Sequence, residues 1–88
     1  MKSWFRFHIH PDPNIGKISC LAVWDGVQYS ASVVEPEGER RVRGRVTCGD
    51  DEDAARQRAD QLLMDAYTHD CQTQQCEPWR AFGVGGPG

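Results

Sequence analysis

The sequence lacks any long hydrophobic run. Its longest nearly apolar stretch, residues 18–24, is interrupted by a serine and is far shorter than the roughly 20 residues that a helix needs to cross a bilayer. The first residues alternate apolar and polar side chains, without the continuous apolar stretch and cleavage site of a secretion signal. We therefore expect no membrane span and a cytoplasmic location, in which the four cysteines are reduced thiols.

The sequence also lacks the motifs of the common active sites. It has no glycine-rich phosphate-binding loop, no serine nucleophile elbow and no helix with paired metal-binding histidines. A cysteine–histidine pair can be drawn only by choosing freely among 4 cysteines and 3 histidines, so such a pair carries no information. We expect a protein that is not an enzyme and that needs no cofactor.

The net charge of -3 conceals an uneven distribution of charge. Through Gly49 the chain has seven Lys and Arg against five Asp and Glu, whereas from Asp50 onward it has three against eight. This division favours a directional contact with a charged partner. Because the pI of about 5.5 is acidic, we expect that partner to be a protein rather than nucleic acid.

Four segments have the composition and alternation of β-strands, and they are residues 2–10, 17–24, 27–34 and 40–48. The second is apolar on both faces, as is typical of a central strand. In the first, we expect Phe5, Phe7 and Ile9 to face the core. The dipeptide Asp25-Gly26 predicts a two-residue hairpin turn between the second and third strands.

A helix is predicted over residues 51–67, with Asp50 as its N-cap. Its buried stripe is predicted to consist of Ala55, Ala59, Leu62, Leu63 and Ala66. We therefore expect one α+β domain over residues 1–70, an antiparallel sheet of three to four strands with one α-helix packed on one face. Residues 71–88 are expected to form a polar, glycine-rich and partly disordered tail.

Five side chains are candidates for binding a partner. Arg41, Arg43 and Arg45 alternate along one predicted strand, and guanidinium groups bind carboxylates or phosphates. The alternative is a solvated face whose arginines pair with nearby glutamates. Trp4 and Trp24 lie at outward-facing or strand-end positions, as interface anchors do, although they also suit the edge of a thin core.

His69, Cys71 and Cys76 have the residue types of a zinc site. Their spacing differs from that of zinc knuckles, which place paired cysteines two to four residues apart and repeat the pair. We therefore expect no bound metal.

The order of strands followed by Gly49-Asp50, Asp53 and Ala54 or Ala55 resembles the HicB-like antitoxin domain over residues 17–67. That family has a β-β-β-α core in which a similar segment opens the helix. HicB-type antitoxins also carry a C-terminal DNA-binding segment, which is not found in this sequence. The layout also resembles small phage anti-CRISPR proteins, stand-alone inhibitors that bind a nucleic-acid-handling complex, and the missing segment fits that class better.

The leading hypothesis is a non-catalytic protein-binding inhibitor from a phage or mobile element, anti-CRISPR-like, that blocks a nucleic-acid-handling complex. One alternative is an antitoxin-like partner that sequesters a small ribonuclease. Another is a small zinc-stabilised nucleic-acid-binding protein. An exposed strand edge at residues 2–10 or 40–48 also favours a homodimer.

Overall fold

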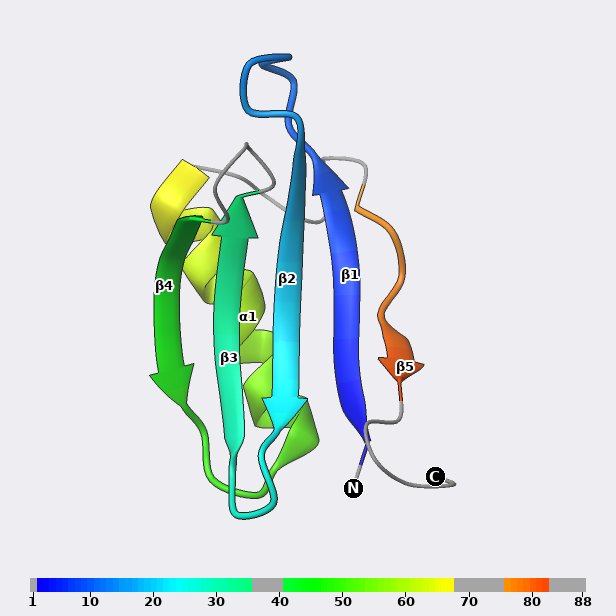
Figure 1. Ribbon diagram of the computed structural model, residues 1–88, viewed down its shortest axis with the longest axis vertical. Coiled ribbons are helices and arrows are strands. Elements are labelled where there is room, and N and C mark those ends of the chain that lie inside the picture. The colour runs from blue at the N-terminus through cyan, green and yellow to red at the C-terminus, as the bar shows by residue number, and fades with distance from the viewer. Residues whose placement is uncertain (1, 36–40, 68–75, 83–88) are drawn as a thin grey trace.

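The computed structural model describes residues 2–35, 41–67 and 76–82, with the side chains of residues 41–43 excepted. These residues form an antiparallel sheet and one helix (Figure 1). The elements are β1 (Ser3–Ile9), β2 (Lys17–Trp24), β3 (Tyr29–Glu35), β4 (Arg41–Thr47), α1 (Glu52–Tyr67) and β5 (Arg80–Phe82).

The sheet has the strand order β4-β3-β2-β1-β5, and all neighbours are antiparallel. The helix lies behind the sheet in Figure 1 and packs mainly over β2, β3 and β4. The predicted α+β fold and the central position of β2 are confirmed. The strand count is corrected to five, because β5 pairs with the outer edge of β1. Three residues are too few to show a period, so alternation could not reveal this strand.

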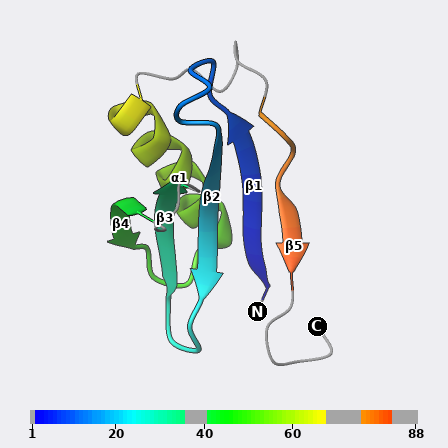
Figure 2. The ribbon, with the colours of Figure 1, turned by 45° about the horizontal axis from the view of Figure 1, so that its top comes forward.

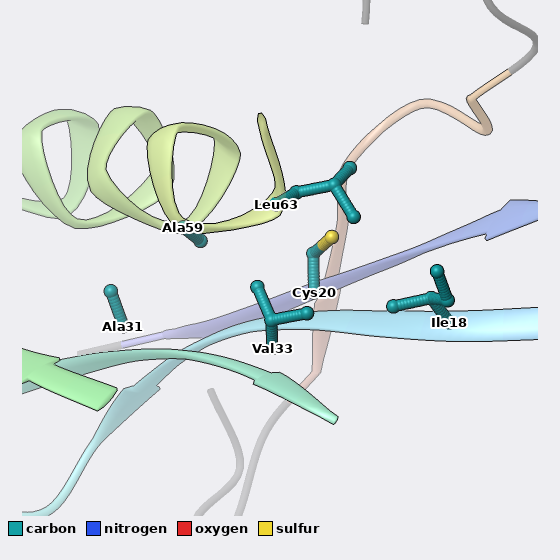
Figure 3. Packing of buried hydrophobic residues seen from close by; sticks show 6 residues of the cluster. All are labelled: Ile18, Cys20, Ala31, Val33, Ala59 and Leu63. Atoms are coloured by element: carbon teal, nitrogen blue, oxygen red, sulfur yellow. The ribbon is translucent and has the colours of Figure 1, made fainter. Parts of the chain in front are cut away.

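The core lies between α1 and the middle of the sheet (Figure 3). Its fully buried residues are Ile18, Cys20, Ala31, Val33, Ala59 and Leu63. Alanines at the contact let the helix approach the sheet. At Gly44 a Cβ atom would lie 3.1 Å from Leu62 Cδ2, so a glycine at this position of β4 allows the close packing. Leu62 and Leu63 belong to the predicted stripe, whereas Ala66 is exposed.

The faces of β1 are the reverse of the prediction. Arg6 and His8 are buried on the helix side, and Ile9 is exposed. The physical reason is that β1 lies beyond the strands that the helix covers directly. Long side chains with polar ends, such as Trp4 and Arg6, reach sideways to carboxylates of α1, while their apolar parts cover the edge of the core.

The predicted hairpin turn contains the expected residues in a different geometry. The hairpin loop between the paired residues Trp24 and Tyr29 has four residues, and Asp25 Oδ1 accepts hydrogen bonds from the N–H groups of Val27 (2.8 Å) and Gln28 (2.9 Å). Gly26 has the expected positive φ of 103°. These two hydrogen bonds, with that of Gln28 the stronger influence, hold the pKa of Asp25 below its usual 3.8.

The N-cap of α1 is Asp51 rather than Asp50. Asp51 Oδ1 accepts hydrogen bonds from the N–H groups of Asp53 (3.0 Å) and Ala54 (3.2 Å). Gly49, with φ of 65°, turns the chain between β4 and the helix. Because Asp50 and Asp51 are both aspartates, the sequence alone does not distinguish which one is the N-cap. The backbone path of this turn places Asp51 at the cap position.

Replacement of the cap tests this assignment. Asp51→Ala should lower the free energy of unfolding by about 1 kcal/mol, because two N–H groups of the first turn lose their acceptor. The matched change Asp50→Ala should cost less than about 0.5 kcal/mol, since Asp50 is exposed and outside the helix. Urea denaturation measures both values, and equal losses would contradict the assignment.

The pH dependence of stability tests the hairpin. A carboxyl whose pKa is lowered by folding stabilises the folded state above its unfolded pKa, and that stabilisation is lost as pH falls. The native chain should therefore melt at a higher temperature than Asp25→Asn at neutral pH, and the difference should shrink as pH falls below 3.8. All other carboxyl groups are common to both chains. A constant difference across this pH range would show that the ionised form has no special role.

Candidate binding surface

The face of the sheet opposite α1, which we call the open face, is covered by no helix among the described residues (Figures 1 and 2). Its side chains are those that alternate along each strand with the side chains on the α1 side. Those with described side chains include Phe5, Phe7, Lys17, Ser19, Leu21, Val23, Ser30, Ser32, Arg45, Thr47, Arg80 and Phe82, of which Ser32 is buried.

Three phenylalanine rings form a line on the open face. The ring centroid of Phe5 lies 5.5 Å from that of Phe7 and 5.5 Å from that of Phe82, both at an interplanar angle of 65°. Edge-to-face pairs of this kind are a favourable aromatic geometry. All three rings remain partly exposed. The line therefore forms an apolar ridge along the β1 and β5 side of the sheet.

Basic side chains flank this ridge. A register row crosses all five strands in the order Arg80, Phe5, Leu21, Ser32 and Arg45, so that each end of the row carries an arginine. Lys17 Nζ lies 4.5 Å from the centroid of the Phe7 ring. Within residues 2–35, 41–67 and 76–82, none of these three cations forms an ion pair. None of the open-face residues named above is acidic, and Glu77, whose N–H donates to the Phe7 carbonyl (3.1 Å), is a carboxylate residue beside the β1 edge.

The acidic residues of the helix lie on the other side of the sheet. Asp51, Asp53 and Asp65 are exposed there, and the positive charge of Arg56 is partly neutralised by its ion pair with Asp53. The uneven charge seen in the sequence is therefore an uneven charge between the two sides of the molecule. An anion that approaches the open face meets a local charge opposite to the net charge of the chain.

Of the predicted arginines, Arg45 lies exposed on the open face. The register of β4 shifts at a bulge opposite Val33 and Val34, and Arg43 falls in this bulge without a paired residue. Arg41 pairs with Glu35, whose side chain accepts a hydrogen bond from Tyr67 of the helix. The bulge thus interrupts the period-two run on which the predicted stripe depends. The side chains of Arg41 and Arg43 lie outside those described.

Trp4 and Trp24, the two tryptophans predicted to bind a partner, lie on the helix side of the sheet. Both pack against the small core cluster of Ala22, Tyr29 and Ala55. Trp4 Nε1 donates a hydrogen bond to Glu52 (3.2 Å), and the Arg56 guanidinium lies 4.2 Å from its ring centroid. The ring centroids of Trp24 and Tyr29 are 5.1 Å apart. The structure therefore does not combine Trp4 and Trp24 with Arg45 in one surface.

The phenylalanines of the open face, Lys17 and Arg80 were not among the predicted binding residues. Alternation assigned Phe5 and Phe7 to the core because they are the apolar members of their strand. The opposite orientation is indicated by Trp4 and Arg6, which alternate with the phenylalanines. Both side chains have N–H donors that can bind the carboxylates of the acidic helix. That signal can be used only when the strand is known to lie beside the helix.

An ion pair between Arg6 and Asp60 holds β1 to the helix. Arg6 also lies over the ring of Trp79, with its guanidinium carbon 5.0 Å from the ring centroid. Partial burial raises the pKa of Asp60, and the attraction of Arg6 opposes this effect. Since Arg6 and Phe5 are neighbours in β1, this pair orients the strand that presents Phe5 and Phe7 on the open face.

The metal candidates are only partly described. His69 and Cys71 lie outside the described residues, and Cys76 Sγ lies 3.4 Å from Nδ1 of the buried His8. Within the described part of the chain, no group of three or more metal-binding side chains comes together. Burial raises the pKa of the Cys20 thiol to about 12, so this cysteine is an inert core residue.

Sheet edges determine where a second strand can add. The edge of β1 that was expected to be exposed is occupied by β5, and the residues just before it continue along β1 through a bridge between His8 and Cys76. The outer edge of β4 pairs with no strand among the described residues. Of the two edges predicted to be exposed, that of β4 is the one that stays unpaired among the described residues.

The described residues include no helix that is both long and apolar enough to span a membrane. Comparison with protein-family models, with curated proteins and with solved structures finds no match to this chain.

Removal of the ion pair tests how β1 is held. Asp60→Asn should lower the free energy of unfolding by about 2 kcal/mol, because the buried Arg6 guanidinium loses its charged partner. The same substitution at the exposed Asp65 on the same helix is the control, with an expected cost below about 0.5 kcal/mol. Chemical denaturation of both variants gives these values. Equal stabilities of the two variants would show that the pair does not hold the strand.

Proposed function

We propose that this chain is a non-catalytic inhibitor, anti-CRISPR-like, that binds a protein complex which handles nucleic acid and acts in the cytoplasm of a bacterial cell. The observation that carries the proposal is the open face, where partly exposed aromatic rings lie between cations that form no ion pair within the described residues. Aromatic and arginine side chains are the residue types that contribute most to binding energy at interfaces.

The geometry of the sheet supports inhibition by occupation of a surface. The candidate side chains lie on strands that are paired along their length, so little conformational entropy is lost when a partner binds. The charge of the open face is opposite to that of phosphates and of the carboxylates that coordinate metal ions in nucleases and polymerases. A surface of this kind suits a site that nucleic acid or a partner subunit would otherwise occupy.

The functional test is expression of the chain in bacteria whose CRISPR immunity restricts a phage, with a panel of immunity types. The native chain should restore plaque formation against at least one type. The double variant Arg45→Glu/Arg80→Glu should lose most of this effect, because it reverses the charge at both ends of the register row. Arg58→Glu, an exposed position on α1, is the control for a charge reversal away from the open face, with half the change in net charge, and should retain the effect.

Failure to restore plaques against every type in the panel would contradict the proposal. Equal loss in the helix control would show that net charge, rather than the open face, is responsible. Rescue of growth when the chain is co-expressed with a small ribonuclease toxin, without any effect on phage restriction, would assign the antitoxin-like function instead.

A further inference from the structure

We propose that the open face binds single-stranded nucleic acid, with phosphates at Lys17, Arg45 and Arg80 and bases against Phe5 and Phe7. This inference rests on the proposed function and deepens it, because it names the contact that the inhibitor makes with its target complex. The bound nucleic acid would be a single-stranded segment that such a complex exposes.

The first argument is charge complementarity. Lys17, Arg45 and Arg80 form no ion pair within the described part of the chain, and the named open-face residues include no carboxylate. The net charge of -3, which favours a protein partner when the chain is considered as a whole, comes from acids that include those of the helix on the opposite side. For a ligand at the open face, the local cations determine the interaction.

The second argument is the arrangement of rings and cations. Arg80 and Arg45 occupy the two edge strands of one register row, which at about 4.8 Å per strand spacing places their Cα atoms about 19 Å apart, with Phe5 between them. A single-stranded nucleic acid that crosses the sheet along this row can contact a cation at each end and an aromatic ring in between. Stacking of bases on aromatic rings combined with cationic contacts is a general mode of single-strand binding.

The Phe7 ring can also contact a base, because the Lys17 side chain beside it can move. Lys17 lies over this ring, with Nζ 4.5 Å from the centroid. Such a contact is weak at an exposed site, and Lys17 is itself exposed. When the flexible lysine turns its ammonium group to a phosphate, one contact with an anion is gained and the ring becomes accessible to a base.

The third argument separates nucleic acid from a protein partner. Partly exposed serines lie on the open face, at Ser19 on β2 and at Ser30 on β3. Serine is depleted in protein interfaces, whereas short hydroxyl groups are common donors to phosphate and sugar oxygens. A duplex is excluded as the preferred ligand because its bases are stacked within the helix and cannot lie against Phe5 or Phe7.

The test is fluorescence anisotropy of the full chain with labelled oligo-dT and oligo-U of about 12 nucleotides, with a duplex of the same length and poly-glutamate for comparison. Single strands should bind more tightly than the duplex. Phe5→Leu, which keeps an apolar side chain but removes the ring, should weaken binding about tenfold. Arg45→Gln/Arg80→Gln should lower the slope of log affinity against log salt by about 1.4, since about 0.7 is lost per phosphate contact.

Two controls keep the result interpretable. Arg58→Gln on α1 should leave both affinity and salt slope unchanged, because it lies away from the open face. Melting curves of every variant establish that the fold is retained. For Phe5, whose substitution reduces packing with Phe82, a second variant at Phe7 provides an independent ring removal.

Undetectable binding of oligo-dT and oligo-U overturns the inference, as does equal or tighter binding of the duplex or binding that the open-face variants leave unchanged. Retention of poly-glutamate in place of the oligonucleotides overturns it as well and assigns the face to an acidic protein segment. These results are separate from the plaque assay. Phage protection without oligonucleotide binding would leave the proposed function standing, and oligonucleotide binding without phage protection would overturn that function alone.

Discussion

The packing of a single helix on one face of the sheet is the constraint on which the rest of the structure depends. Ala59 and Leu63 of α1 lie against buried residues of β2 and β3, and small side chains at the contact bring the two layers close together (Figure 3). One helix can cover only part of a five-stranded sheet. The described part of the chain therefore places no second layer on the other face, and β1 and β5 extend beyond the helix.

The position of β1 beside the helix links this constraint to the candidate binding surface. Because α1 packs mainly over β2, β3 and β4, β1 is joined to the helix by the long side chains Trp4 and Arg6, which bind Glu52 and Asp60. The alternate side chains then necessarily point to the opposite side of the sheet. The same ion pair that completes the edge of the core thus determines that Phe5 and its neighbours line the open face.

The two sides of the molecule have different electrostatic characters. Acidic residues stabilise the start of α1 through its cap and its dipole, so they are concentrated on the helix side. The cations of the open face have no such local role, and they lie at the edge strands and at the end of β2. A net charge calculated from the sequence averages over this separation. Contacts at one side of the sheet depend on the local charge instead.

The sequence by itself determined those elements whose signals are local. Alternation and helical spacing are properties of neighbouring residues, so the strands β1 to β4 and the helix α1 could be located from them. The exposed position of Arg45 on the open face also follows from this alternation. The short strand β5 carries too few residues for any period to be read.

Only the tertiary structure decided which face of β1 meets the helix, which aspartate caps α1 and which arginines share a surface. Period two states that the faces of a strand differ, but it does not state which one is covered. That depends on where the strand lies relative to α1, and for Phe5 and Arg6 this position reverses the usual rule. The bulge in β4 decides which arginines share a surface, and the backbone path of the turn before α1 decides which aspartate caps the helix. Both depend on the conformation of the folded backbone rather than on single residues.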